Sequence, residues 1–410
     1  MRIVILILVI SLNMVGLARA EKQPDLFHLR NLLYSHDFDS AEQMLSTYNS
    51  AYLEGQSSYR DYHWVYETLW KDDDVEKAWL EMALKKWVQQ APDSAYANAV
   101  LGKFYFDKGF DARGGRWSSE TSDDQFSGMR GNFKEAFKYL NTGLSKDPNI
   151  VFAHIAILNM IKTNSGANIT PLSYMDRVPD KVKSQYAIWS HLLQTIVPRW
   201  GGSNEEIMHV IDNEVPKYIK NISDQDRQTM MDTITYDQMQ MAIAINNEFK
   251  KGLKIGKDSI KAKTEYAGVY EIASNGAQQL DDYKTCYKYG KIATQMRPYR
   301  GEGWRRYGFC ALKLQKWEEA NEAYRYKINI DGLSVYSVFQ LGVTYMYLHQ
   351  YDKAYALFKK SEELDPTYPK YTKQYTSWIE ADQKDKMNLV GKDIFEMIGS
   401  VPYKGATLPE

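Results

Sequence analysis

Hydrophobic and polar positions between residues 301 and 366 repeat with a period of 34. When the stretch is shifted by that length, similar side chains coincide: Tyr307-Gly308 with Leu341-Gly342, Trp317 with Tyr351, Ala320 with Ala354, Tyr324 with Phe358, and the helix breaker Gly332 with Pro366. Two small positions separated by large ones predict two antiparallel helices that approach closely. The large residues then fill the groove toward the next pair.

The same pattern extends toward the N-terminus by one more period. Tyr283 falls at the Trp317 position, Cys286 at the Ala320 position and Pro298 at the Gly332 position. The stretch from 266 to 368 resembles the tetratricopeptide repeat. This resemblance implies an all-α fold, an α-solenoid of stacked antiparallel helix pairs with a concave face for a protein or peptide.

The first part of the chain carries weaker versions of this pattern. Apolar stripes predict helix pairs over 25–50 and 59–92, and Pro92 should end one helix before Ser94 caps the next. We therefore expect a degenerate helical-repeat domain over 21–265. Residues 369–410 are expected to form capping helices and a tail.

One repeat in this domain is interrupted. Its two small positions, Gly102 and Ala136, are separated by the length of a whole repeat, whereas Gly308 and Ala320 lie only 12 apart. The difference predicts a 22-residue insertion at about 109–130, which we expect to be a long loop. Long loops inside compact repeats are uncommon and often functional.

Several motifs around this insertion occur in a fixed order: Pro92-x-Ser94, Asp111-Ala112-Arg113-Gly114, Asp147-Pro148 and Pro198-Arg199-Trp200-Gly201-Gly202-Ser203. With them, residues 60–300 resemble the bacterial domain-of-unknown-function family 4034. The resemblance supports the helical architecture and implies no known activity.

The N-terminal segment, 1–20, is typical of a signal peptide. Arg2 precedes an apolar run at 3–15, and Ala18-Arg19-Ala20 has the small-x-small form of a cleavage site. Cleavage between Ala20 and Glu21 would give a periplasmic or secreted protein. A retained amphipathic anchor is the alternative. No other stretch is apolar enough to span a membrane, so no membrane contact is expected after cleavage.

Charge argues against some classes of partner. Removing Arg2 and Arg19 from the 51 basic residues leaves 49 against 52 acidic ones, a net charge of about −3. This balance is unlike that of proteins whose main partner is nucleic acid or an anionic membrane surface. A protein or peptide partner fits the repeat pattern better.

No sequence motif identifies a catalytic or metal site. The 7 histidines are scattered without metal-ligand spacing, and there is no Cys-x-x-Cys pair. No nucleophile motif is present, and Gly252-x-x-x-Gly256-Lys257 lacks the length and context of a phosphate loop. We expect no cofactor and no metal, and an enzyme is the less favoured class.

The candidate binding residues lie in the insertion and in the glycine-rich turn. Asp111, Arg113, Arg116 and Trp117 belong to the insertion, and Arg199 and Trp200 to the turn at 198–203. Arginine and tryptophan often anchor interfaces, so we expect the insertion to fold onto the turn. The alternative is that the two segments only stack on each other for structural reasons.

Three functions remain open at this point. The first is an exported scaffold that binds a protein or peptide. The second is an enzyme or enzyme subunit with an Arg/Trp-lined site for an anionic substrate. The third is an accessory or immunity-type protein that shields one partner.

The state of the two cysteines is also open. Cys286 and Cys310 fall at adjoining small positions of neighbouring repeats. An exported protein can form a disulfide there, but two free buried thiols are equally compatible with a repeat core.

Overall fold

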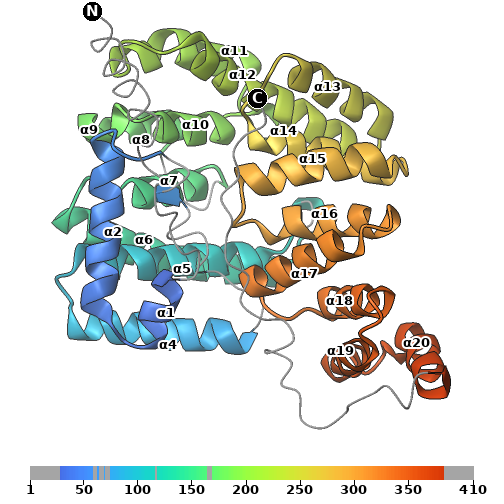
Figure 1. Cartoon of the computed structure of the whole chain (residues 1–410). Helices are drawn as coiled ribbons and strands as arrows, with labels where there is room; N and C mark the ends of the chain where they lie inside the picture. The colour runs from blue at the N-terminus through green and yellow to red at the C-terminus, as the bar shows by residue number, and fades with distance from the viewer. Residues whose placement is uncertain are drawn as a thin grey trace, which may run out of the picture.

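The computed structural model describes residues 28–58, 62–63, 69, 74–115, 118–163 and 169–382, and all regular secondary structure within them is helical. The expected all-α solenoid of helix pairs is confirmed. Figure 1 shows the helices in two adjoining stacks, the N-terminal one in blue and green and the C-terminal one in yellow and red. The chain ascends the first stack, crosses over through α11 and α12, and descends the second.

The N-terminal stack contains α1 (His28–Tyr34), α2 (Phe38–Leu53), α4 (Asp74–Gln90), α5 (Ala95–Arg113), α6 (Asp123–Lys146) and α7 (Val151–Ile161), followed by α8 (Pro171–Tyr174), α9 (Asp180–Lys183) and α10 (Tyr186–Thr195). The Ser94 hydroxyl accepts a hydrogen bond from the Ala97 amide, as expected for the cap of α5. Trp87, Phe133 and Trp189 are almost fully buried in the core of this stack.

The crossing consists of α11 (Asn204–His209), α12 (Asp224–Gln240) and α13 (Phe249–Lys261). The stretch over 224–264 thus contains two helices. A turn of π-helix at 241–245 and the positive φ of Asn247 separate them.

The C-terminal stack contains α14 (Ala267–Gln279), α15 (Tyr283–Met296), α16 (Gly301–Lys313), α17 (Trp317–Asp331), α18 (Val335–Tyr347), α19 (Tyr351–Leu364) and α20 (Pro369–Asp382). First helices begin at 267, 301 and 335 and second helices at 283, 317 and 351, so both sets advance by the period seen in the sequence. The expected period is confirmed. The closing helix expected beyond 383 lies outside the described residues.

Each pair in this stack turns through the same backbone conformation. Asp281, Gln315 and His349, each one period after the last, have φ values of 55°, 60° and 58°. The amide that follows each of them donates to a carbonyl five positions earlier, at 2.9 Å in all three pairs. His36 makes the same turn between α1 and α2, with φ of 59° and a 2.9 Å bond from Asp37 to Leu32.

The small positions allow the close helix contacts that the sequence predicts. A Cβ added at Gly342 would lie 2.8 Å from the Phe358 ring, and one at Gly102 would lie 2.7 Å from the Leu140 side chain. Ala320 and Ala354 are fully buried. Side chains larger than hydrogen at these glycines would push the paired helices apart.

The insertion at 109–130 is not the long loop that we expected. Residues up to Arg113 extend α5, and residues from Asp123 onward begin α6, which Ser122 and Gln125 start with a capping box. Phe110 packs edge-on against Phe133 with ring centres 5.2 Å apart. The extra residues therefore mostly lengthen the two helices, because their apolar side chains continue the contact between them.

The two stacks contact each other through α1 and α17. Arg30 of α1, 4% exposed, donates hydrogen bonds to the carbonyls of Asn329 and Ile330 in α17, at 3.2 and 3.3 Å. These carbonyls lie near the C-terminal end of α17, where a cation is favoured. The N-terminal helix thus closes the curved solenoid onto its own C-terminal repeats.

Cys286 and Cys310 are joined in a disulfide, with Cα atoms 6.1 Å apart. The bond links α15 to α16, which belong to successive helix pairs. It therefore fixes an interface between repeats. Among the helices that the structure describes, none has both the length and the apolar character needed to cross a membrane.

Candidate functional site

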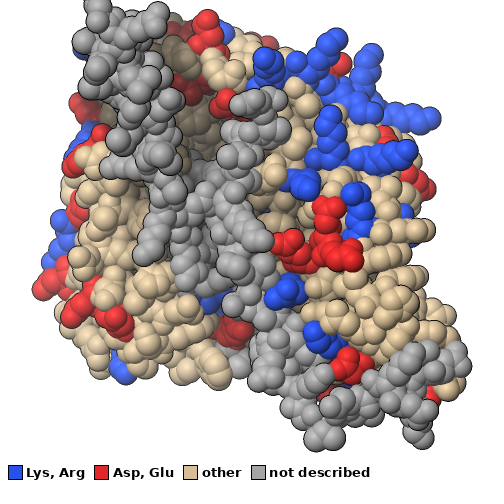
Figure 2. Space-filling model, in the orientation of Figure 1, with Lys and Arg blue, Asp and Glu red and all other residues tan. Residues whose placement is uncertain are grey.

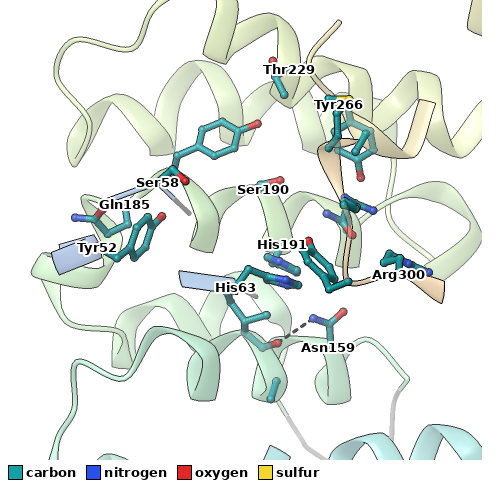
Figure 3. A pocket seen from close by; sticks show the side chains of 18 of the residues that line it. Tyr52, Ser58, His63, Asn159, Gln185, Ser190, His191, Thr229, Tyr266 and Arg300 are labelled. Atoms are coloured by element: carbon teal, nitrogen blue, oxygen red, sulfur yellow. Dashed lines mark hydrogen bonds between the residues drawn. The ribbon is translucent and has the colours of Figure 1, made fainter. Parts of the chain in front are cut away.

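A cavity of about 1180 Å³ lies between the two stacks. The N-terminal stack contributes residues of α5, α7 and α10, and the other walls come from α12, the start of α14 and the turn between α15 and α16. Figure 3 shows side chains from these separate segments pointing toward one space. The curvature of the solenoid therefore creates a concave interior large enough for a short extended peptide.

Aromatic and imidazole rings form one wall of the cavity. His63 lies against Tyr299, with ring centres 4.9 Å apart, and is nearly parallel to His191 at 6.2 Å. His63 and His191 are adjacent in Figure 3. Tyr266 and Tyr299 are only 5% and 8% exposed. These rings offer flat surfaces for stacking.

Arginine side chains lie beside this wall. Arg297 lies 3.6 Å from the Glu271 carboxylate and 5.9 Å from the centre of the Tyr266 ring. Burial opposes the charge of Arg297, but the Glu271 carboxylate and the neighbouring tyrosines together raise the Arg297 pKa. The same carboxylate raises the pKa of Arg300. Both guanidinium groups are therefore held in the charged form.

Lys162 provides another cation in the lining. Its amine donates to Asn159 at 2.8 Å and lies over the rings of Trp200 and Phe110, at 5.1 and 5.8 Å from their centres. Burial and then the charge of Arg199 lower the Lys162 pKa to about 8. Lys162 is half-buried. Holding a charged amine against aromatic rings costs stability, and perturbed pKa values of this kind are concentrated at functional sites.

The rest of the lining is mixed, with apolar side chains such as Phe106, Ile155 and Met296 beside polar ones. Lys103 and Asp107 form an ion pair at 2.7 Å on α5, so their charges cancel. Exposed carboxylates of Asp226 and Glu265 line another part of the wall. Tyr52, Gln185 and Ser190 are labelled around the same space in Figure 3. The cavity thus combines apolar surfaces with both signs of charge.

The glycine-rich turn lies next to the cavity. Arg199 makes an ion pair with the buried Asp237 at 2.8 Å and lies 5.8 Å from the centre of the Tyr236 ring. Burial raises the Asp237 pKa, and the charge of Arg199 opposes this rise. Trp200 packs on Lys162. Both residues border the lining without belonging to it.

The described candidates of the insertion lie on α5. Asp111 accepts from Lys77 at 2.9 Å, and Arg113 donates to the Gly114 carbonyl at 3.2 Å. Neither lines the cavity. Arg116 and Trp117 lie outside the described residues, so the expected contact of the insertion with the turn stays a prediction. Phe110, at its start, does meet Trp200 across the Lys162 amine.

In the part of the chain that the structure describes, no group of histidine, cysteine or carboxylate side chains could hold a metal ion. His63 stacks on the His191 ring and lies against the Tyr299 ring.

The outer surface differs from the cavity. Figure 2 shows Lys and Arg side chains gathered over α13 and α15. Exposed lysines of these two helices include Lys250, Lys251, Lys254, Lys257, Lys284 and Lys288. They face solvent, without the aromatic walls that surround the cavity cations.

Comparison with known families agrees with both resemblances. Residues 335–368 match the tetratricopeptide repeat, and residues 25–163 match Domain of unknown function (DUF4034). The second match begins and ends earlier than the 60–300 expected from the motifs, and the first covers α18 and α19. No curated protein matches the chain. The repeat makes this a helical scaffold of the kind that binds proteins.

None of the sequence motifs includes the residues that line the cavity. His63, His191 and Arg300 are far apart in sequence and belong to no local motif. One signal was present: Pro298 occupies the breaker position of its repeat, so Arg297 and Arg300 flank a turn between helix pairs.

Proposed function

We propose that this protein is an exported scaffold that binds a protein or peptide segment in the cavity between its two helical stacks. The observation that carries the proposal is the cavity itself, which combines a wall of aromatic and histidine rings with charged arginines. Aromatic and arginine side chains contribute most of the binding energy in protein interfaces. Repeat solenoids bind partners on their concave face.

The proposed location is the periplasm or the exterior. The pattern of residues 1–20 supports it, and so does the Cys286–Cys310 bond, because structural disulfides persist mainly in oxidising compartments. N-terminal sequencing of the protein recovered from the periplasm should begin at Glu21. An intact Met1 on protein from the cytoplasm would refute the proposal.

The binding proposal can be tested by obstructing the cavity. Thr229 lines the cavity from α12, and its hydroxyl bonds only within its own helix, to Gln225. Thr229→Trp should therefore place a bulky ring in the free space with little loss of other contacts. Lys288→Trp places the same side chain on the exposed face of α15 and is the matched control.

Tagged mature protein and both variants would be incubated with periplasmic extract of the producing organism, and bound proteins compared by mass spectrometry. A partner captured by wild type and by Lys288→Trp but lost with Thr229→Trp supports binding in the cavity. Equal capture by all three proteins would contradict it.

A further inference from the structure

The connection between α15 and α16 places two arginines at one corner of the cavity. The Arg300 amide donates to the Arg297 carbonyl at 3.1 Å, which closes the turn. The buried Pro298 lies between them, and its carbonyl accepts from the Trp304 indole at 2.7 Å. The turn is thus fixed by proline and by two hydrogen bonds, so the two arginines begin from a rigid backbone.

Positive charge exceeds negative charge around this turn. The cations gathered here are Arg297, Arg300, Arg305, Arg306 and Lys327, and the carboxylates are Glu271, Glu302 and Asp331, the last of which lies against Gly301. Glu302 is already engaged by Arg305 at 2.6 Å and by Arg306 at 2.8 Å. Asp331 pairs with Lys327 at 2.6 Å. Of the three carboxylates, Glu271 is the one that acts on both Arg297 and Arg300.

The side chains of Arg297 and Arg300 differ in how many interaction partners they have. Arg297 has the Glu271 contact at 3.6 Å and the Tyr266 ring. The Arg300 side chain has no hydrogen bond or ion pair within the described structure, although it lines the cavity and is accessible to solvent. A guanidinium presents several N–H donors in a planar fork that matches a carboxylate. Arg300 is therefore available to a ligand.

We infer that this turn is an anion-binding corner of the cavity, at which Arg300, supported by Arg297, receives a carboxylate carried by the bound protein or peptide. The inference rests on the proposed function and makes it specific, since it requires an acidic residue in the bound segment. Tyr299 lies between the two arginines in sequence and packs at a tilt against His63, so the aromatic wall adjoins the charged corner.

The first test measures the composition of selected peptides. Random peptides displayed on phage would be selected against wild type, Arg300→Gln and Arg300→Glu, with Arg227→Gln as the control. Arg227 lies on α12 outside the lining and pairs with Asp212 at the surface. Wild type and Arg227→Gln should select peptides containing Asp or Glu. Arg300→Gln should bind these peptides at least about tenfold more weakly, because a hydrogen bond to a charged group is lost.

Arg300→Glu should reverse the preference toward peptides containing Lys or Arg. Peptides selected by wild type without acidic residues, or acidic peptides bound equally by Arg300→Gln, would overturn the inference while leaving the proposed function in place.

A second test does not depend on peptide binding. In protein labelled with 15N-arginine, the side-chain Nε signal missing from Arg300→Gln identifies Arg300. Sodium succinate should shift this signal saturably, and sodium phosphate titrated separately shows whether the corner accepts phosphate as well. If wild type selects no peptides but the signal shifts, the proposed function fails and the anion corner stands. No shift with either anion overturns the inference.

Discussion

The bond between Cys286 and Cys310 gives a prediction whose size follows from the structure. It joins α15 to α16 across the interface between two successive helix pairs, with a sequence separation of 24. Both residues are fully buried, and the Ser274 hydroxyl donates to the Cys286 carbonyl at 2.9 Å as well as to its sulfur at 3.6 Å, so the hydroxyl keeps a partner when the sulfur is removed. Replacing both by alanine should therefore remove the covalent link without leaving an unsatisfied polar group.

Loop-closure entropy for a loop of this length corresponds to about 3 kcal/mol. At about 2 °C per kcal/mol for a chain that unfolds as a single large unit, the Cys286→Ala/Cys310→Ala variant should melt about 6 °C below wild type. The shift becomes larger if the C-terminal repeats unfold as a smaller unit, because the entropy of unfolding is then smaller.

Thermal unfolding followed by circular dichroism, with and without dithiothreitol, is the assay. Reduced wild type should melt close to the double variant, and the double variant should not respond to dithiothreitol. The reasoning fails if oxidised and reduced wild type unfold at the same temperature.

Three further predictions concern other parts of the fold. Gln315→Gly should raise the free energy of unfolding in urea by about 1 kcal/mol, because Gln315 has φ of 60°, which glycine adopts without strain; a loss of stability would contradict this account of the turn. Lys162, whose pKa is lowered to about 8 by burial, carries a folding penalty that disappears as pH rises from 8 toward the ordinary value of 10.5. Lys162→Met should therefore melt above wild type at pH 7 with a gap that narrows by pH 10, and a gap independent of pH would refute the burial argument. Arg30→Met removes the bonds to Asn329 and Ile330 and should cost about 1–3 kcal/mol and increase the radius of gyration in small-angle scattering, whereas an unchanged radius would show that the stacks do not need this contact.

The regular repeats could be predicted from the sequence because every local signal agreed. Small residues at Gly308 and Ala320, and breakers at Gly332 and Pro366, recur with the period that the helices follow. A fold can be predicted from the sequence when local pattern and packing agree in this way. The prediction of a long loop at 109–130 was wrong because the sequence spacing gives the length of the insertion but not the way its side chains pack. Phe110 continues the apolar stripe that meets Phe133.

The site was harder to predict because it is formed by curvature. His63, His191 and Arg300 meet only after the solenoid bends and α1 reaches α17, and no local periodicity encodes that bend. The arginine and tryptophan candidates do include a residue next to the cavity, since the Trp200 ring packs on the Lys162 amine. The sequence did not predict the cavity, because its candidate residues lie in the insertion and the glycine-rich turn. Arg300 lies instead in the short turn between two repeats.

The central claim is that the partner binds between the two stacks. It can be tested most directly by placing a photo-activatable phenylalanine analogue at Gln194, which lines the cavity, and at Lys288 on the exposed face of α15, in the cells that make the protein. Irradiation should cross-link a partner from Gln194 and not from Lys288. Cross-links that form from Lys288 alone would contradict the account.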